Sequence, residues 1–343
     1  MTANSWPRGH LTFPFSASFA VVFTLAPHSG HSSSTVSSLR PPSIAILLRI
    51  TVVLARLARK APARATVSSM GQGRLVVLDG PMGTELARRG VALPAPAWSA
   101  VALDLAPDLV AAVHRDYVAA GATVHTANTF RTKRRSVGPR WEELARRAVR
   151  IAREAVGSLR VAGSIAPLED CYRPDLSPGL ASREEHRELA RVLADEGVDV
   201  LLCETFPDPT EAVVAVEEAV RTGVETWAAL LPATPASLRD AARACVAAGA
   251  RVVLVNCVAA RDTLPFIAAL ADLGVPFGAY ANAGREEDGL GWGADEDAGA
   301  MAYEALARTW IAAGASVIGG CCGTGPAHIA RLATLKPSPT TPA

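Results

Sequence analysis

The chain has 343 residues, of which 50% are hydrophobic and only 5% aromatic, and this length suits one large globular domain or two small ones. Its formal net charge of +1 hides an uneven distribution. Eight Lys or Arg residues and no Asp or Glu precede Asp79, which leaves 26 of the 34 basic residues against all 33 acidic ones in the remainder. For a globular part with a net charge of −7 we expect no nucleic-acid partner.

Residues 1–70 differ in composition from the rest of the chain. They are rich in Ser, Arg and Pro and show no sustained helical or strand period. Their most apolar stretch, 44–57, contains two arginines and is shorter than the roughly 20 residues that span a bilayer, so we predict no membrane association. An acid-free leader of this kind is typical of an organelle transit peptide. The composition favours a disordered extension, or upstream sequence ahead of a true start at Met70.

From Arg74 onward, short β-rich apolar runs alternate with helical segments. The predicted strands are 75–79, 123–128, 161–166, 198–205, 226–231, 251–257, 277–282 and 316–321. The predicted helices are 108–120, 141–156, 183–196, 210–221, 237–248, 263–273 and 295–313, with a last one starting near Pro326. Eight strand–helix units over about 260 residues match a (β/α)₈ TIM barrel. We therefore predict a single α/β domain over 71–337, with a disordered tail at 338–343.

An open, doubly wound sheet is the alternative fold. Such a sheet more often has a glycine-rich phosphate loop after its first strand. Here the first strand is followed by Asp79-Gly80-Pro81-Met82-Gly83-Thr84-Glu85, which does not have the G-x-G-x-x-G spacing. The sequence therefore favours the barrel.

Six cysteines are too few and too irregularly spaced for a disulfide scaffold in a domain of this size. This indicates a reducing compartment, and we predict a cytoplasmic location. Three of them, Cys171, Cys203 and Cys245, are expected to be buried structural cysteines, because free Cys is among the most buried residue types.

The other three cysteines lie at strand ends. Cys321 and Cys322 follow two glycines at the end of the eighth strand, and Cys257 ends the sixth. Neighbouring cysteines are poor disulfide partners. Active sites of barrels lie at the carboxyl ends of the strands, so these three thiols would meet there. Three thiolates on zinc leave one tetrahedral position open, as in catalytic zinc sites; the alternative is again a structural role.

Several polar residues also end predicted strands. Glu204, at the end of the fourth strand, suits a substrate ammonium group, or else interacts with the dipole of the next helix. Asp79, before Gly80, is either a pocket residue or a turn former. For Asn128, Thr129 and Asn282 the same two roles, site residue or turn residue, remain open.

The remaining candidates are aromatic or imidazole side chains. His125, inside a strand, is expected to be packed rather than a ligand. His114 and His186, on helices outside the barrel, are expected at the surface. Trp98 with Ser99 either closes the pocket as a lid or covers the barrel end.

On these residues the sequence resembles the homocysteine S-methyltransferase family over essentially all of 74–335. The Asn256-Cys257 and Gly319-Gly320-Cys321-Cys322 motifs together are highly specific. The individually weaker matches are 79–86, 98–100, 114–121, 126–130, 163–164, 204–205, 211–212, Asn282 with Gly284, and 323–324.

The resemblance implies a zinc-dependent barrel enzyme that transfers a methyl group to homocysteine to form methionine. It implies that Cys257, Cys321 and Cys322 bind Zn²⁺. It also implies that Glu204 binds the amino group of homocysteine, with Asp79, Gly80 and Asn282 as further substrate-binding residues. Coordination to zinc deprotonates a bound thiol, so homocysteine would be held as a nucleophilic thiolate.

Two loops depart from the family pattern, and they lie where a methyl donor would approach. They are 281–284, here Ala-Asn-Ala-Gly, and 165–170 after the third strand. The sequence ends soon after the eighth unit, without cobalamin or folate modules or the extra C-terminal segment of betaine-using relatives. We therefore expect a sulfonium donor, S-methylmethionine or S-adenosylmethionine.

Two alternatives stay open at this point. One is methylation of another thiol or selenol such as selenocysteine, and the other is a non-catalytic zinc- or thiol-binding barrel. Retention of Glu204 beside the cysteines favours an enzyme, because a metal store needs no ammonium ligand. The expected partners are homocysteine and a small-molecule methyl donor, for a monomer or a weak homo-oligomer.

Overall fold

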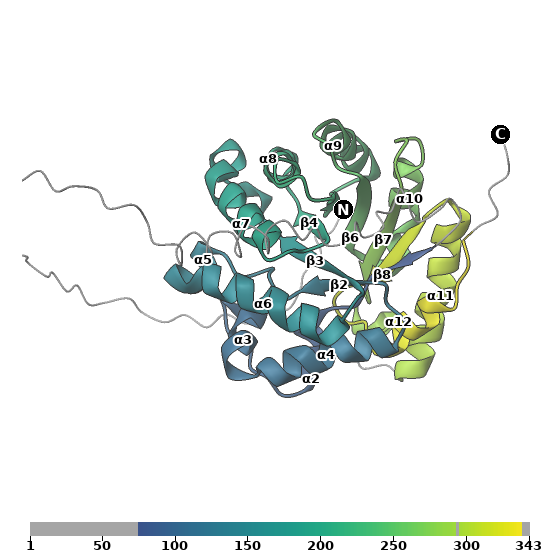
Figure 1. Cartoon of the computed structure of the whole chain (residues 1–343). Coiled ribbons are helices and arrows are strands. Elements are labelled where there is room, and N and C mark those ends of the chain that lie inside the picture. The colour runs from purple at the N-terminus through teal and green to yellow at the C-terminus, as the bar shows by residue number, and fades with distance from the viewer. Residues whose placement is uncertain (1–74, 293–294, 338–343) are drawn as a thin grey trace, which may run out of the picture. The chain divides into compact units, whose positions relative to one another are not determined.

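The structure, a computed structural model, describes residues 75–292 and 295–337 (Figure 1). The predicted extension over 1–70 and the predicted tail at 338–343 lie outside the described residues. Among the helices described, none is long and apolar enough to cross a membrane.

Eight parallel strands form the centre of the molecule, and helices surround them (Figure 1). The strands are β1 (Val76–Val77), β2 (Val124–Ala127), β3 (Arg160–Ile165), β4 (Val200–Phe206), β5 (Thr226–Leu230), β6 (Val252–Ala259), β7 (Phe277–Asn282) and β8 (Val317–Gly320). Their order is β1-β8-β7-β6-β5-β4-β3-β2. A parallel bridge between Leu78 and Val124 links the two ends of this order. The predicted TIM barrel is therefore confirmed.

The helices fall into a predicted set and an unpredicted set. The predicted set is α4 (Pro107–Ala119), α6 (Trp141–Val156), α7 (Arg183–Asp195), α8 (Pro209–Val220), α9 (Pro235–Ala247), α10 (Leu264–Leu270), α11 (Glu296–Ala312) and α12 (Pro326–Ala333), each near its predicted position. Three short helices, α2 (Met82–Arg88), α3 (Ala102–Leu105) and α5 (Arg134–Val137), were not predicted. Of these three, α2 and α3 precede α4, and α5 precedes α6.

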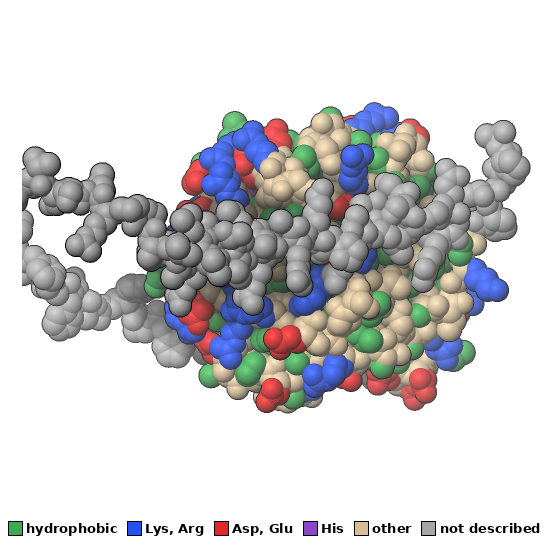
Figure 2. All heavy atoms as spheres, viewed as in Figure 1, with side chains coloured by type: hydrophobic (Ala, Val, Ile, Leu, Met, Phe, Trp, Pro, Cys, Tyr) green, Lys and Arg blue, Asp and Glu red, His purple; other side chains and the backbone are tan. Residues whose placement is uncertain are grey.

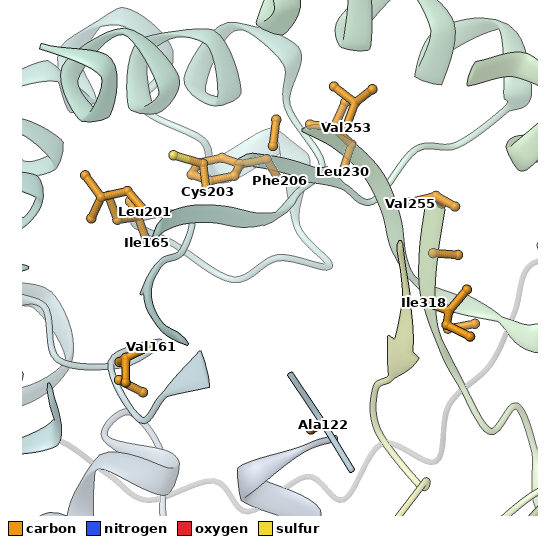
Figure 3. Packing of buried hydrophobic residues seen from close by; sticks show 14 of the residues in the cluster. Ala122, Val161, Ile165, Leu201, Cys203, Phe206, Leu230, Val253, Val255 and Ile318 are labelled. Carbon is orange, nitrogen blue, oxygen red and sulfur yellow. The ribbon is translucent and has the colours of Figure 1, made fainter. Parts of the chain in front are cut away.

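The apolar core has two layers, because side chains alternate across each strand. In β4, Leu201 and Cys203 point outward and pack with the helices, whereas Val200 and Leu202 belong to a separate cluster inside the barrel. Figure 3 shows the outer layer, with Leu201, Cys203 and Phe206 on one side and Val253, Val255 and Ile318 further round. In β4 the next inward position after Leu202 is Glu204, which lies at the barrel mouth.

Acidic and basic side chains are mixed on the visible face rather than gathered by sign (Figure 2). Ion pairs also join neighbouring helices. Glu218 of α8, for example, is fully buried and accepts hydrogen bonds from Arg183 and Arg187 of α7 at 2.6 and 2.9 Å.

The prediction that His114 and His186 lie at the surface was wrong, since both are completely buried. His114 lies on the face of α4 that also buries Val110, Val113 and Tyr117. His186 similarly lies on the buried face of α7, where its Nε2 is 3.1 Å from Oε1 of Glu211. The helical spacing therefore contained the signal, because residues three and four apart share a face. His125 is packed as predicted, with Nε2 3.2 Å from the carbonyl of Ala122.

Candidate metal and substrate site

A cavity of about 620 Å³ opens among the carboxyl ends of the strands and the loops that follow them. The predicted residues Cys257, Cys321, Cys322, Asp79 and Glu204 are among those that line it. Gly80 also contributes to the wall. The structure therefore brings together six of the seven residues that the sequence nominated.

The three cysteines form one cluster. The Sγ atoms of Cys257 and Cys321 are 2.8 Å apart, and those of Cys321 and Cys322 are 4.0 Å apart. All three sulfurs lie within 4.8 Å of one another and are partly exposed to the cavity. Three sulfur ligands converging from two strand ends form a group that suits a soft metal ion.

The remaining cysteines are all buried, as predicted. Cys203 and Cys245 belong to the outer core. Cys171 differs from them because it also lines the cavity, from the loop after β3.

Cys257 sits at an irregular point of β6. Its φ of +55° is in the left-handed region, and the register with β7 shifts between Asn256 and Ala259. This conformation turns Cys257 out of the regular strand, and strained positions of this kind cluster at functional sites. The amide of Asn282 secures the turn, donating from Nδ2 to the carbonyl of Cys257 at 2.8 Å and accepting from the N–H of Gly284 at 2.8 Å.

Asn282 was predicted to bind substrate, but it is not among the residues that line the cavity. Both ends of its amide serve the backbone instead.

Helix α2 holds the cysteine pair after β8. Arg88 donates to the carbonyls of Thr324 and Gly323 at 3.0 and 2.9 Å, and the hydroxyl of Thr84 accepts from the N–H of Gly323 at 3.2 Å. On the strand side, the N–H of Cys321 donates to the carbonyl of Ala281 at 2.9 Å. The loop that carries both thiols is thus fixed from two directions.

Mutual contacts separate the acidities of the three thiols. The contact with Cys321 raises the pKa of Cys257, whereas hydrogen bonds from Cys257 and Cys321 hold the pKa of Cys322 well below its ordinary value. The neighbouring thiols therefore favour the thiolate form of Cys322.

Glu204 is buried at the end of β4 and hydrogen-bonded on both oxygens. The hydroxyl of Ser164 donates to Oε1, and that of Tyr280 donates to Oε2 at 2.9 Å. Burial nevertheless raises the pKa of Glu204. Among the described residues Glu204 has no cationic partner, and a buried carboxyl of this kind suits a cationic ligand group. This favours the predicted ammonium role over a helix-dipole role.

The backbone beside Glu204 is also irregular. Thr205 has φ of +65°, and the register with β5 shifts between Glu204 and Phe206. The side chain of Asn256 donates to the hydroxyl of Thr205 at 2.7 Å. This bond joins the irregular end of β4 to that of β6, so the carboxyl and the first thiol are positioned together.

Asp79 is the second carboxyl of the cavity. Its oxygens accept from the N–H and the hydroxyl of Thr126 at 2.8 and 3.0 Å. Burial raises its pKa to about 8, and the nearby charge of Glu204 adds to this effect. Gly80 is required sterically, since a Cβ there would lie 2.6 Å from the hydroxyl oxygen of Tyr117.

Two further predicted strand-end residues differ in role. Asn128 exchanges hydrogen bonds with Ser99, donating to its carbonyl and accepting from its hydroxyl at 2.9 and 2.8 Å. It therefore ties the Trp98 segment to β2, and Trp98 lines the cavity beside Phe130. Thr129 is fully buried and donates to the carbonyl of Ser164 at 2.9 Å, so it joins β2 to β3.

Sequence reasoning missed three supporting residues. Tyr280 and Ser164, which hold Glu204, were both detectable, because they occupy inward positions in the alternation of β7 and β3. Glu211 was not detectable in this role. It anchors the loop after β3 by accepting from the N–H of Leu168 and the hydroxyl of Ser177 at 2.8 and 2.6 Å.

A parallel barrel with a thiol cluster and buried carboxyls at the carboxyl ends of its strands has the layout of a barrel enzyme. The family model for Homocysteine S-methyltransferase matches residues 76–335. The Escherichia coli K12 "Homocysteine S-methyltransferase" is 32% identical over 304 residues, covering 75% of this chain and 94% of that protein. Bacillus subtilis "Homocysteine S-methyltransferase YbgG" is also 32% identical, covering 76% and 93%.

Solved structures agree with the sequence comparison. The metallated form of the homocysteine methyltransferase MmuM from Escherichia coli superposes with a TM-score of 0.67 at 29% identity, covering 80% of this chain and 99% of that one.

A further sequence relative, the "Selenocysteine methyltransferase" of Astragalus bisulcatus, is 28% identical over 326 residues, covering 79% of this chain and 95% of that protein. The chain belongs to the homocysteine S-methyltransferase family of enzymes.

Proposed function

We propose that this protein transfers a methyl group from a sulfonium donor, S-methylmethionine or S-adenosylmethionine, to homocysteine, forming methionine. The observation that carries the proposal is the convergence of three thiols and two buried carboxyls in one cavity of a chain that belongs to this family. The catalytic unit is the predicted domain over 71–337.

The donor set of Cys257, Cys321 and Cys322 suits Zn²⁺, because three thiolates leave one tetrahedral position for a substrate thiol. Zinc would supply a substrate sulfur that is deprotonated at neutral pH and still nucleophilic. The protein's own part is to hold the ligands in place. Asn282 does so for Cys257, and α2 does so for the loop of Cys321 and Cys322.

Glu204 and Asp79 are proposed to bind the ammonium group of homocysteine, with Gly80 lining the same pocket. A cationic group is the natural ligand for two buried carboxyls, since it lowers the cost of their ionisation. Anchoring the amino end fixes where the sulfur lies. Orientation of this kind supplies much of the barrier reduction in a two-substrate reaction.

Methyl transfer is then a displacement at carbon. A lone pair of the homocysteine sulfur forms the new C–S bond, and the bonding pair of the old C–S⁺ bond leaves with the donor sulfur as a neutral thioether. The aromatic rings of Trp98, Phe130 and Tyr172 line the cavity. Aromatic faces attract a sulfonium cation as they attract other cations, which supports a donor of this class.

We also propose that the protein acts as a monomer or a weak homo-oligomer. The chemistry requires reduced thiols, which supports a cytoplasmic location.

The test is methionine formation by the full, zinc-loaded chain from homocysteine, with S-methylmethionine or S-adenosylmethionine as sole donor. We expect turnover that is lost in Cys321→Ser together with bound zinc. In Glu204→Gln we expect zinc to be retained and the KM for homocysteine to rise roughly 10- to 100-fold, the value of a charge-assisted hydrogen bond. Cys245→Ser, in a core cysteine remote from the cavity, is the matched control. Zinc binding without methionine formation from either donor would contradict the proposal.

A second candidate substrate is a selenol, because two relatives are named selenocysteine methyltransferases. Comparison of kcat/KM for selenocysteine and homocysteine with the same donor decides between them. A preference for selenocysteine would reassign the acceptor and leave the roles of the cysteines unchanged.

A further inference from the structure

Arg131 is a cationic side chain in the cavity without a carboxylate partner. It follows Phe130 in the loop after β2, and its guanidinium carbon lies 5.4 Å from the centroid of that ring. Within the described part of the chain it makes no hydrogen bond or ion pair, and its Nε is buried without a partner. An arginine has five N–H donors, so this one has unused capacity facing the cavity.

The second arginine of the cavity shows that carboxylates are available nearby. Arg135 lines the same space but pairs with Glu169, and with Glu185 at 2.6 Å. Arg131 is only four residues away and has no such partner. Keeping a partly buried guanidinium unpaired is unfavourable unless a ligand supplies the counter-charge.

The unpaired cation and the two buried carboxyls come from different segments of the cavity wall. Asp79 and Glu204 are buried at the ends of β1 and β4, whereas Arg131 lies partly exposed on the loop after β2. Two further carboxylates line the cavity from the loop after β3, but neither pairs with Arg131, since Glu169 pairs with Arg135 and Asp170 accepts from the N–H of Tyr172. A ligand that reaches from the buried carboxyls to Arg131 therefore meets negative groups at one end and a positive group at the other. This is the pattern of an α-amino acid, which carries an ammonium and a carboxylate.

We propose that Arg131 binds the α-carboxylate of an amino-acid substrate, either the thiol acceptor or the sulfonium donor. The planar guanidinium matches a carboxylate with two parallel hydrogen bonds, which an ammonium group cannot reproduce. The identity of the amino acid rests on the proposed function, but carboxylate recognition itself requires no methyl transfer. It is therefore measurable by binding alone.

The experiment compares each substrate with its decarboxylated analogue by calorimetric titration of the zinc-loaded full chain. The pairs are homocysteine with 3-aminopropane-1-thiol, and S-methylmethionine with (3-aminopropyl)dimethylsulfonium. In Arg131→Met, which keeps the apolar stem over Phe130, we expect one carboxylated ligand to lose roughly 10- to 100-fold in affinity while its analogue is unaffected. Arg131→Lys should recover part of that loss.

The affected pair identifies the source of the carboxylate, acceptor or donor. Arg134→Gln is the control, since Arg134 is a neighbouring exposed arginine paired with Glu188 at 3.0 Å. Equal losses for a ligand and its analogue, or no loss in either pair, would overturn the proposal. Methionine formation is assayed separately. Carboxylate discrimination without turnover would contradict the proposed function alone, and turnover without discrimination would contradict the role of Arg131 alone.

Discussion

Burial raises the pKa of Asp79, and the nearest ionisable groups do not offset this effect. Two of them, His114 and His125, have pKa values lowered to about 3 and about 4, because burial disfavours the imidazolium. Both are therefore neutral near pH 7 and give Asp79 no counter-charge. The other close group, Glu204, is itself a carboxyl. Asp79 thus remains protonated in the free protein up to about pH 8.

This gives Asp79 a pH-dependent effect on stability. Between about pH 4 and pH 8 the folded state keeps a proton that the unfolded state has lost, so the free energy of unfolding falls as pH rises. Asp79→Asn mimics the protonated form and removes this loss. By denaturant titration we expect the stability difference between variant and wild type to grow from pH 5 to pH 8, by at most about 1.4 kcal/mol per pH unit. Asp240→Asn, in an exposed residue of α9, serves as control. A difference that does not change with pH would show that Asp79 is already ionised at pH 5.

Some residue-scale features of the site were predictable and others were not. The three cysteines and Glu204 were predictable, because barrel topology brings strand ends together whatever their separation in sequence. The left-handed backbone of Cys257 and Thr205 was not, since neither residue type favours positive φ. Arg131 was not identified either, because its lack of a partner is a property of the folded surroundings.

At the scale of elements, the approach of β7 to β8 depends on a missing side chain. Gly278 pairs with Val317, and a Cβ at Gly278 would lie within van der Waals overlap of the Val317 carbonyl. Because the obstructing atom belongs to the backbone, it cannot move aside without displacing β8. The close packing of β7 against β8, the strand that leads to Cys321, therefore requires glycine at position 278.

We expect Gly278→Ala to destabilise the protein by about 3 kcal/mol or more, the upper range for overpacked cores. The matched control is Gly163→Ala in β3, where the added Cβ meets the flexible side chain of Leu193 at 3.1 Å. Its cost should be clearly smaller. The free energy of unfolding of both variants, measured by denaturant titration, is the test. Equal costs would show that β8 accommodates the methyl group.

The existence and order of the main elements were predictable because their patterns are local. Apolar runs gave the strands, and helical spacing gave the ring helices. The short helix α2 was not predicted, and neither were the hydrogen bonds from its Arg88 to the loop that carries Cys321 and Cys322. The partners of Arg88 lie 235 and 236 residues away, so no local pattern indicates the contact.

At the scale of the whole molecule, the cysteine cluster connects β6 to the loop after β8. An ion held there binds the folded state in preference to the unfolded one, so it should raise the unfolding temperature. We expect added Zn²⁺ to raise the melting temperature of the wild type and removal by a chelator to reverse the shift. Cys321→Ser should show a smaller response or none, and Cys245→Ser should respond as the wild type does. Equal responses in all three proteins would place the ion elsewhere.

The hydrogen bonds from α2 to the loop that carries Cys321 and Cys322 also bear on the order of events during synthesis. A ribosome makes Cys257 sixty-four residues before Cys321, and makes α2 long before either. In a growing chain, Arg88 and Thr84 of α2 therefore lack the loop that they contact in the folded protein. Cys257 likewise lacks the thiols of Cys321 and Cys322. Metal capture and closure of the barrel must both wait for the eighth strand. The cluster of three cysteines is thus completed late in biosynthesis, when most of the barrel has already been synthesised.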